Sequence, residues 1–322
     1  MNQYPNDASF SMKHVQTVVN RIFPSISTHI KRVTEGVSTY VYRITSYNET
    51  FYLRILPEEG ASFAPEAAVH ARLRQMQVRV PEVIYIEPYN DLLQRSIMVT
   101  TEIPGRPIGQ SQEIGGEVLA EIVREVGRDI ARINSLTVEG FGWVKRDTPT
   151  TEVLQAEWPT YREFADEYWE ADMAYLACYV LSAVEVAQLE RVRASYDSWL
   201  DLEQGCLVHG DFDTSHIYQE HGCYSGIIDF GEIRGANRWY DLAQFYMRDR
   251  EQLLWPLESA LMRGYEEIVS LPADYGLRIH FTGLLTNVRA LARSLQKRPP
   301  NHFTQYQLKM LRENLAMCLC HC

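Results

Sequence analysis

The sequence predicts an α+β fold with two lobes, a small strand-rich lobe followed by a larger and mainly helical one. Three observations predict it. Apolar residues alternate between residues 39 and 55, which indicates strands with one buried face. Residues 119–133 carry apolar side chains three and four apart, the spacing of an amphipathic helix. Residues 206–230 are rich in Gly, Asp and His and interrupt the helical pattern, so short strands and loops are expected there.

The N-terminal lobe is expected to cover residues 1–103. Its clearest element is a hairpin over residues 39–55, in which the turn Asn48-Glu49 separates two alternating runs. The other predicted elements are helices over 12–23 and 65–76, the second with Pro65 near its start, and strands over 83–86 and 97–99. After these strands, Ile103-Pro104-Gly105 breaks the pattern and the composition changes.

The C-terminal lobe, residues 104–322, is expected to be mainly helical. The predicted helices, with breaks inside the longer ones, are 119–133, 160–182, 184–199, 240–268 and 276–296. Within the interruption, residues 216–218 and 226–228 suit a hairpin around 219–225. Such a hairpin would return Asp229 close to Asp211.

Charge is unevenly distributed over the 322 residues. The net charge is −11, and residues 1–103 carry equal numbers of acidic and basic side chains, so the whole acidic excess belongs to residues 104–322. An acidic surface disfavours nucleic acid and anionic membranes as partners. It either favours a cationic ligand or simply keeps the surface solvated, and charge alone does not choose between these.

The sequence also predicts a soluble, cytoplasmic protein. No apolar run reaches the roughly 18 residues of a membrane span, and the N-terminus lacks the basic start and apolar core of a signal peptide. The six cysteines form no disulfide framework, which fits a reduced compartment. The tail from Cys318 to Cys322 contains ligands for a soft metal, but it lies at a chain end, where poor order is expected.

The interruption carries the residues with the clearest chemistry. One segment is His209-Gly210-Asp211, with His216 five residues after Asp211, and the next is Ile228-Asp229-Phe230-Gly231. Phosphoryl transfer needs one carboxylate that orients the attacking hydroxyl and accepts its proton. It needs a second carboxylate that holds a metal bridging the phosphates. Asp211 and Asp229 are the candidates for these two roles.

These motifs resemble those of a known family. The pattern HxDxxxxN, a short hairpin and then ID[FW]G is the signature of the aminoglycoside phosphotransferases and their choline-kinase-like relatives, distant cousins of protein kinases. The resemblance runs from about Thr34 to Phe245 and includes Tyr240-Asp241-Leu242-Ala243, in which Asp241 matches a structural acid. It implies a two-lobed, protein-kinase-like fold with a nucleotide-binding lobe over 1–103 and a catalytic, substrate-binding lobe over 104–322.

The resemblance also implies the reaction and its cofactors. The enzyme would transfer the γ-phosphate of ATP, with Mg²⁺, to a hydroxyl of a small molecule. Residues 99–105 match the hinge between the lobes, where the backbone near Thr101 and Ile103 would bind the adenine edge. Backbone contacts leave little side-chain pattern, so GTP is not distinguished from ATP.

Site residues are carried over position by position. Asp211 matches the catalytic Asp and Asp229 the metal-binding Asp, whereas His216 stands where the family has Asn. Mg²⁺ prefers oxygen ligands, and an imidazole nitrogen suits Mn²⁺ or Zn²⁺ better. Three outcomes are open: His216 binds the metal, Asp213 supplies the missing oxygen, or catalysis is lost and a nucleotide-binding regulator remains.

The nucleotide phosphates would be held by the first lobe. Residues 31–39 resemble the nucleotide-positioning loop, in which the hydroxyls of Ser38 or Thr39 could reach phosphate oxygens. Arg54 stands where the family has Lys or Arg, and its guanidinium could pair with the α- and β-phosphates. Glu66 matches the acid that holds this cation in place.

The acceptor would lie beside the helical lobe, where residues 157–172 carry six acids and one base. Asp166 and Glu170 are four apart, as are Glu163 and Glu167, so each pair would share a helix face. Such a face suits a cationic, amino-sugar-like acceptor, with Asp166, Glu167 and Glu170 as contacts, or it is simply a solvated acidic helix. A macrolide, an amino alcohol, a sugar or a metabolite is the alternative acceptor.

Overall fold

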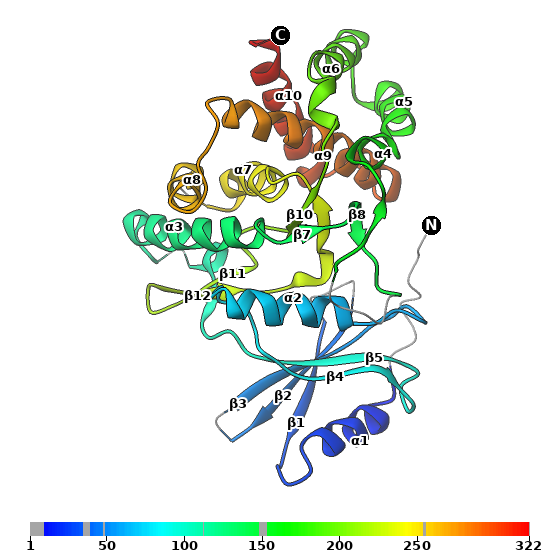
Figure 1. Ribbon diagram of the computed structural model, residues 1–322, viewed down its shortest axis with the longest axis vertical. Helices are drawn as coiled ribbons and strands as arrows, with labels where there is room; N and C mark the ends of the chain where they lie inside the picture. Colours follow the sequence, from blue (N-terminus) through cyan, green and yellow to red (C-terminus); the bar gives the residue numbers. More distant parts are fainter. Residues whose placement is uncertain are drawn as a thin grey trace. The chain divides into compact units, whose positions relative to one another are not determined.

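A computed structural model describes residues 10–34, 39–47, 49–111, 113–147, 153–253 and 256–321 of the chain (Figure 1). The chain divides into two compact units. The first unit consists of Met1–Pro104, Lys145–Leu154 and Ser225–Gly231, and the second of Gly105–Val144, Gln155–Tyr224 and Glu232–Cys322. The first is built on a β-sheet and the second is mainly helical, so the α+β class is confirmed.

The first unit contains one antiparallel sheet of five strands in the order β1-β2-β3-β5-β4. Its elements are α1 (Met12–Ile22), β1 (His29–Val33), β2 (Tyr40–Ser46), β3 (Glu49–Ile55), α2 (Ala64–Gln75), β4 (Val83–Asn90) and β5 (Arg95–Thr101). The predicted helices, hairpin and later strands are confirmed. Strand β1 was not predicted, because an edge strand with the sequence HIKRV has no apolar alternation.

The two faces of this sheet carry different kinds of side chain. Leu53 and Ile55 of β3 pack with Val15 and Val19 of α1 in one apolar cluster. Successive side chains of a strand point to opposite faces, so Arg54 lies on the face away from α1. Helix α2 belongs to the same side as Arg54, because its Glu66 contacts that residue. The strand alternation therefore gives one face to the core and places a cation on the other.

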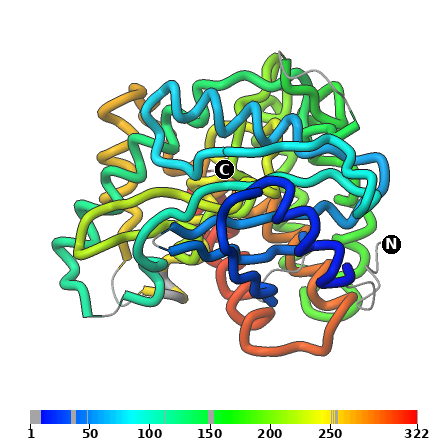
Figure 2. The backbone as a smooth tube through the Cα atoms, turned by 90° about the horizontal axis from the view of Figure 1, so that it is seen from below, coloured from blue at the N-terminus to red at the C-terminus, as the bar shows by residue number. Residues whose placement is uncertain are grey.

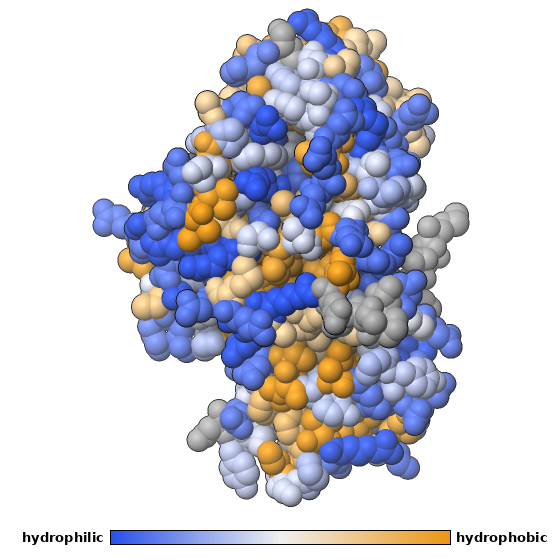
Figure 3. Space-filling view, viewed as in Figure 1, coloured by the Kyte–Doolittle hydropathy of each residue, from blue (hydrophilic) through white to orange (hydrophobic). Residues whose placement is uncertain are grey.

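Apolar residues also reach the surface of the first unit. Figure 3 shows them over its sheet. Ile84 and Tyr89 of the edge strand β4 are exposed. Scattered apolar side chains of this kind are ordinary on a protein surface and indicate no site by themselves.

The second unit combines helices with small sheets. Its helices are α3 (Gly116–Ile133), α4 (Tyr161–Asp166), α5 (Trp169–Tyr179), α6 (Ala183–Ser195), α7 (Tyr240–Gln252), α8 (Glu258–Glu266), α9 (Tyr275–Lys297) and α10 (His302–Leu319). One sheet has the order β7-β10-β13-β8-β9, formed by Thr137–Val138, Gly205–Val208, Arg234–Ala236, Phe141–Val144 and Ala156–Trp158. A second sheet has the order β12-β11-β6, formed by Cys223–Ile227, Ile217–Glu220 and Arg106–Pro107. Strand β12 carries the chain from the second unit into the first.

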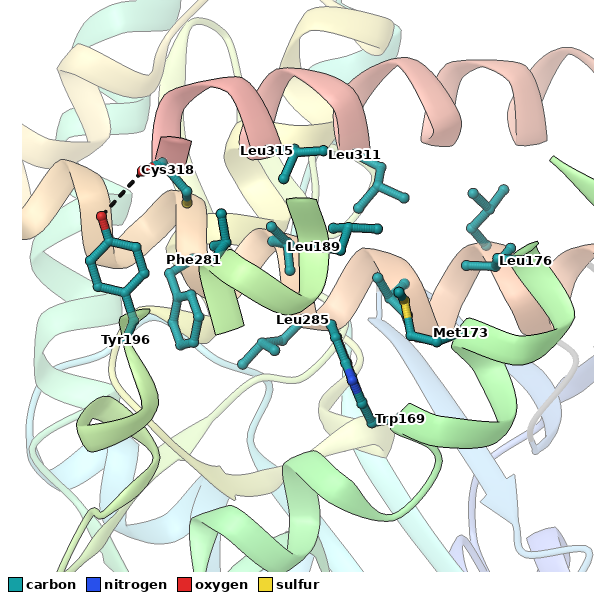
Figure 4. Packing of buried hydrophobic residues seen from close by; sticks show 14 of the residues in the cluster. Trp169, Met173, Leu176, Leu189, Tyr196, Phe281, Leu285, Leu311, Leu315 and Cys318 are labelled. Carbon is teal, nitrogen blue, oxygen red and sulfur yellow. Dashed lines mark hydrogen bonds between the residues drawn. The ribbon is translucent and has the colours of Figure 1, made fainter. Parts of the chain in front are cut away.

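Helix α10 was not predicted, and it completes the core of the second unit. It lies beside α9 (Figure 2). Its Leu311, Leu315 and Cys318 pack against residues of α5, α6 and α9 (Figure 4). The hydroxyl of Tyr196 donates to the Cys318 carbonyl over 3.2 Å. The expectation of poor order for the tail is therefore wrong at Cys318, which is fully buried. Cys322 lies outside the described residues.

Two sequence predictions need correction in this unit, the shared helix face of Asp166 and Glu170 and the length of a hairpin turn. The predicted helix 160–182 contains a break of the kind expected in the longer helices, because α4 ends at Asp166 and α5 begins at Trp169. Asp166 and Glu170 therefore do not share one continuous helix face. The hairpin turn is also tighter than predicted, since only His221 and Gly222 separate β11 from β12, with φ angles of 52° and 80°. Positive φ at both residues is typical of a two-residue type I′ turn.

In the part of the chain that the structure describes, no helix has both the length and the apolar composition needed to cross a bilayer.

Candidate active site

Arg54 is the centre of a buried charge cluster in the first unit. Its Nη1 donates to Glu66 Oε1, and its Nη2 lies 3.6 Å from Asp229 Oδ1. Only 8% of Arg54 and 2% of Glu66 are exposed. Burial alone lowers the pKa of the guanidinium, but the carboxylates of Glu66 and Asp229 outweigh burial, so its pKa is raised. Arg54 is therefore a fixed, permanently charged cation.

This cluster also has unused hydrogen-bonding capacity. Arg54 Nη2 and Glu66 Oε2 are both buried, and neither has a hydrogen-bond partner among the described residues. A buried N–H without an acceptor costs free energy unless a ligand supplies one. An anionic oxygen, such as that of a phosphate, would be a suitable acceptor for Nη2.

The residues after Asp229 are held against helix α2. The Phe230 ring packs edge-on against His70, with centroids 5.1 Å apart, and His70 Nδ1 donates to the Pro81 carbonyl over 2.9 Å. Asp229 has a φ of 66°, a conformation that is rare outside glycine. Its side chain is 46% exposed. The backbone thus turns the Asp229 carboxylate toward Arg54 while leaving it accessible.

Gly231 leaves room for this pair. A Cβ at this position would lie 3.1 Å from Arg54 Nη2 and 3.2 Å from Asp229 Oδ1, closer than ordinary contact. The guanidinium of Arg146 donates to the Gly231 carbonyl, and the Arg146 carbonyl accepts from Ser62 N over 2.8 Å. Sequence reasoning missed Arg146, and its only sequence signal was its place in the basic pair with Lys145.

The predicted hinge residues differ in what their backbone can offer. The Thr101 amide donates to Glu82 O over 2.9 Å, and the Glu102 amide donates to Thr50 O over 3.2 Å. The Ile103 amide makes no hydrogen bond within the described ranges. Of these three amides, Ile103 is the one open to a ligand. In the nucleotide-positioning loop, Thr39 is described and half-buried, while Ser38 lies outside the described residues.

In the second unit, Asp241 supports the loop that carries Asp211. Its carboxylate accepts from the amides of His209 and Gly210 over 2.8 and 3.0 Å. Asp241 is fully buried at the start of α7, and burial raises its pKa against the opposing effects of His209, the two amide donors and Arg234. The expected structural role of Asp241 agrees with this geometry.

The same loop needs a glycine at position 210. Gly210 has a φ of 86°, and a Cβ there would collide with the Glu232 carbonyl. The Gly210 carbonyl accepts from Gln244 Nε2 over 3.0 Å and from Arg234 Nη1 over 3.1 Å. The guanidinium of Arg234 also stacks on Trp143, 4.1 Å from the ring centroid. These contacts fix the loop so that the next residue, Asp211, stands exposed at its tip.

His216 is hydrogen-bonded to the backbone of Asp211. Its Nδ1 lies 2.7 Å from the Asp211 carbonyl, and a carbonyl only accepts, so Nδ1 carries the proton. Nε2 of a neutral ring then keeps its lone pair. Only 15% of the His216 side chain is exposed. The ring therefore supports the Asp211 loop through Nδ1.

Both carboxylate oxygens of Asp213 are already occupied. Oδ1 accepts from the amide of Ser215 over 2.7 Å and from its hydroxyl, while Oδ2 lies 3.2 Å from Arg248 Nη2. Burial raises the pKa of Asp213, but Ser215, Arg248 and His216 outweigh burial, and the pKa is lowered. Asp213 is thus an ionised carboxylate that holds the loop together.

The acidic stretch 157–172 is partly neutralised. Asp166 pairs with Arg193, and the buried Asp172 lies 3.0 Å from Arg289. The two acids at the break between α4 and α5, Glu167 and Glu170, are exposed. Of the three predicted acceptor contacts, Asp166 already has a partner within the protein.

The predicted residues fall in different units. Arg54, Glu66 and Asp229 belong to the first and Asp211, Asp213 and His216 to the second, so the expected approach of Asp211 to Asp229 stays a prediction. Among the described residues, no three His, Cys, Asp or Glu side chains form a group that could hold a metal by themselves.

Sequence comparison identifies the family. A model of the phosphotransferase enzyme family matches residues 29–276, more than three quarters of the chain. The chain belongs to this family. It is a small-molecule phosphotransferase that acts on hydroxyl groups. No curated protein matches it in sequence.

Solved structures share the fold of this chain. Aminoglycoside phosphotransferase APH(4)-Ia is 16% identical with a TM-score of 0.63, covering 96% of this chain and 98% of its own. A Thermobifida fusca YX-ER1 protein described as a fructosamine-3-kinase is 17% identical with a TM-score of 0.59, covering 94% and 99%. A GDP and kanamycin complex of the enzyme APH(2″)-IIIa is 16% identical with a TM-score of 0.62, covering 94% and 98%. The predicted protein-kinase-like fold of this phosphotransferase is confirmed.

Proposed function

We propose that this phosphotransferase uses ATP and a divalent cation to phosphorylate a hydroxyl group of a small molecule. The observation that carries the proposal is the buried Arg54, which is held by Glu66, faces Asp229, and keeps one N–H group without an acceptor. A buried guanidinium with a free donor is suited to an anionic oxygen, such as that of a phosphate.

The nucleotide would contact three parts of the first unit. Arg54 Nη2 would bind the phosphates, the hydroxyls of Ser38 or Thr39 would assist, and the free amide of Ile103 would meet the base. Similar solved structures contain ADP or AMP-PNP with hygromycin B, and GDP with kanamycin. These complexes support a nucleotide and a polar small molecule as ligands. ATP is our choice of donor, and GTP is the alternative.

A divalent cation fits the remaining donors. Asp229 would offer carboxylate oxygens, which suit Mg²⁺, and His216 would offer Nε2, which suits Mn²⁺ better. When bound, the cation would neutralise charge on the phosphates. Asp213 is better assigned to loop structure, because both of its oxygens already have partners. His216 donates a hydrogen bond to the backbone of Asp211 and so supports the loop. This contact favours an active enzyme over the alternative of a nucleotide-binding regulator without activity.

Asp211 would act on the acceptor. Its exposed carboxylate would hydrogen-bond to the acceptor hydroxyl and take its proton as the oxygen attacks the γ-phosphorus. The new bond joins the acceptor oxygen to phosphorus, the bond from phosphorus to the β,γ-bridging oxygen breaks, and ADP leaves. Asp241 would keep Asp211 in place through the amides of His209 and Gly210.

Exposed acidic residues of the second unit bear on the acceptor class. A cationic, amino-sugar-like compound is one candidate, because Glu167 and Glu170 are exposed and similar structures hold aminoglycosides. The internal pairing of Asp166 and Asp172 weakens this candidate, since those charges are not free for a ligand.

The test is ADP release by the purified protein with Mg·ATP or Mn·ATP. The acceptor panel contains aminoglycosides, macrolides, amino alcohols and sugars. We expect turnover on one class and its loss in Asp211→Ala, with nucleotide binding retained. Because the exposed Asp211 has no structural partner for its carboxylate in the described loop contacts, this variant should fold, which circular dichroism would verify. Full turnover in folded Asp211→Ala would refute the role of this residue.

A further inference from the structure

A pocket lies where α9 ends and α10 begins. It has a volume of about 220 Å³. Three cations line it, Arg293, Lys297 and Arg298, together with Asn301, Phe303 and Thr304. No acid is among its lining residues. All of these residues belong to the second unit, whose overall charge is acidic.

The three cations lack the acidic partners that neighbouring cations have. Within the described ranges, none of Arg293, Lys297 and Arg298 forms an ion pair. On the same helix, by contrast, Arg278 pairs with Asp274 over 2.9 Å and Arg289 with Asp172 over 3.0 Å.

Arg293 and Lys297 are four residues apart, so they share one face of α9, where like charges destabilise a helix. The pKa of Lys297 is lowered, chiefly by the positive charge of Arg293 and to a smaller extent by burial, Arg298 and Arg289. This repulsion would be relieved by an anion.

The start of α10 adds to the positive potential. Helix α10 has 18 residues and no acid in its first turn. No acid side chain compensates the partial positive charge of its N-terminus there, where Asn301 and Thr304 form a reciprocal capping box. A cation in the last turn of a helix is favourable because of the helix dipole, and this explains the presence of Lys297 in α9. The dipole does not explain Arg293, which precedes the last turn, or Arg298, which follows it.

Contacts connect the pocket to the loop of Asp211. The Phe303 ring lies 5.3 Å from the guanidinium carbon of Arg248. Arg248 in turn lies 3.2 Å from Asp213, two residues after Asp211. One wall of the pocket is thus in contact with the side chain that anchors the catalytic loop.

We propose that this pocket binds an anionic group, a phosphate or a carboxylate, carried by the hydroxyl compound that the enzyme phosphorylates. The assignment to the acceptor rests on the proposed function, whereas anion binding itself does not. Under this proposal the acceptor is an acidic compound, such as a sugar phosphate or a hydroxy acid, and not a cationic one. A free anion is the other source of the same chemistry, and the experiment has an arm for each.

The first arm measures binding of inorganic phosphate by calorimetry, without nucleotide or acceptor. Lys297→Gln and Arg293→Gln should each weaken binding about tenfold or more, because each removes a charged donor. Lys309→Gln is the matched control, since Lys309 is exposed on α10, pairs with Glu313 and does not line the pocket. Equal binding in all four proteins, or no binding to any, would overturn the proposal.

The second arm measures ADP release with sugar phosphates and hydroxy acids against their uncharged counterparts. We expect turnover on an anionic acceptor, competition by phosphate, and a rise in KM of about tenfold in Lys297→Gln with kcat retained. An acceptor KM that Lys297→Gln leaves unchanged, with phosphate binding lost, would assign the pocket to a free anion and overturn its link to the acceptor. Phosphate binding that the variants abolish, with no turnover on any acceptor, would support the pocket and count against the proposed function.

Discussion

His216 donates a hydrogen bond from Nδ1 to the backbone carbonyl of Asp211 over 2.7 Å. An asparagine amide could make the same contact with its NH₂ group and would keep an oxygen for a metal. The imidazole keeps a nitrogen instead. Histidine in place of asparagine therefore preserves the support of the loop and would change the kind of metal ligand that the loop could offer.

The first prediction concerns metal preference. Since nitrogen ligands favour Mn²⁺ over Mg²⁺, the ratio of turnover with Mn²⁺ to turnover with Mg²⁺ should fall about tenfold in His216→Asn. His221→Asn is the matched control, because it makes the same change in an exposed turn whose positive φ suits Asn. An unchanged ratio in His216→Asn would show that this ring does not contact the metal.

The second prediction concerns the buried pair of Arg54 and Glu66. Glu66→Gln removes the charge that sits closest to a buried guanidinium, so the free energy of unfolding should fall by about 3 kcal/mol. Nucleotide affinity should fall as well, because Arg54 loses its fixed position. Urea unfolding and nucleotide titration measure the two effects.

Its control is an exposed pair of the same types. Glu82 lies 3.1 Å from Arg74, and both side chains are about half exposed. Glu82→Gln should change the free energy of unfolding by about 0.5 kcal/mol or less. Similar losses in Glu66→Gln and Glu82→Gln would mean that burial adds nothing to the Arg54 pair.

The third prediction concerns Gly231. In Gly231→Ala the new methyl group crowds Arg54 and Asp229, and the ends of these side chains must shift by a few tenths of an ångström. Turnover should fall about tenfold, since small displacements of positioning groups are costly in catalysis, with about 1 kcal/mol lost in stability. Gly276→Ala, whose Cβ meets open space in α9, should leave turnover unchanged. Wild-type turnover in Gly231→Ala would contradict the tight fit.

The fourth prediction concerns acid stability. The pKa of Asp213 is lowered in the folded protein, so the unfolded chain binds its proton at higher pH. Its contribution to stability is therefore complete above about pH 5 and is lost as the pH falls through about 4 toward the folded pKa. Asp213→Asn should lose less stability than the wild type between pH 6 and pH 3, by urea unfolding at each pH. Asp91→Asn, in the exposed turn between β4 and β5, should keep the wild-type profile.

Sequence patterns predicted the elements that have a strong period. The hairpin of β2 and β3 and helix α3 follow from alternation and from the three-and-four spacing. Helix α10 was missed because many polar residues lie between its apolar ones, so its sequence shows no clear helical period. Its apolar residues are buried only because they pack against α9 and α6. Strand β1 was missed because its pairing with β2 uses backbone groups, which leave no side-chain pattern.

The site residues divide in a similar way. Arg54 and Glu66 could be matched by position, and the structure brings them together. Arg146 and Arg248 could not be found, because each acts through a contact made by the fold, with the Gly231 carbonyl and with Asp213. The unpaired cations at the end of α9 were not identified from the sequence, because the charge of the C-terminal half was considered only as a whole, where it is acidic.

The discontinuous course of the chain has a consequence for dissection of the protein. The first unit takes residues 225–231 from a point more than a hundred positions beyond Pro104. A fragment ending at Pro104 would lack Asp229 and leave Arg54 with one carboxylate in place of two. It would also lose Gly226, where the backbone packs against Arg79 and Ile103. Truncation at Pro104 would therefore not yield an intact first unit, because this unit is assembled from three separate segments of the chain.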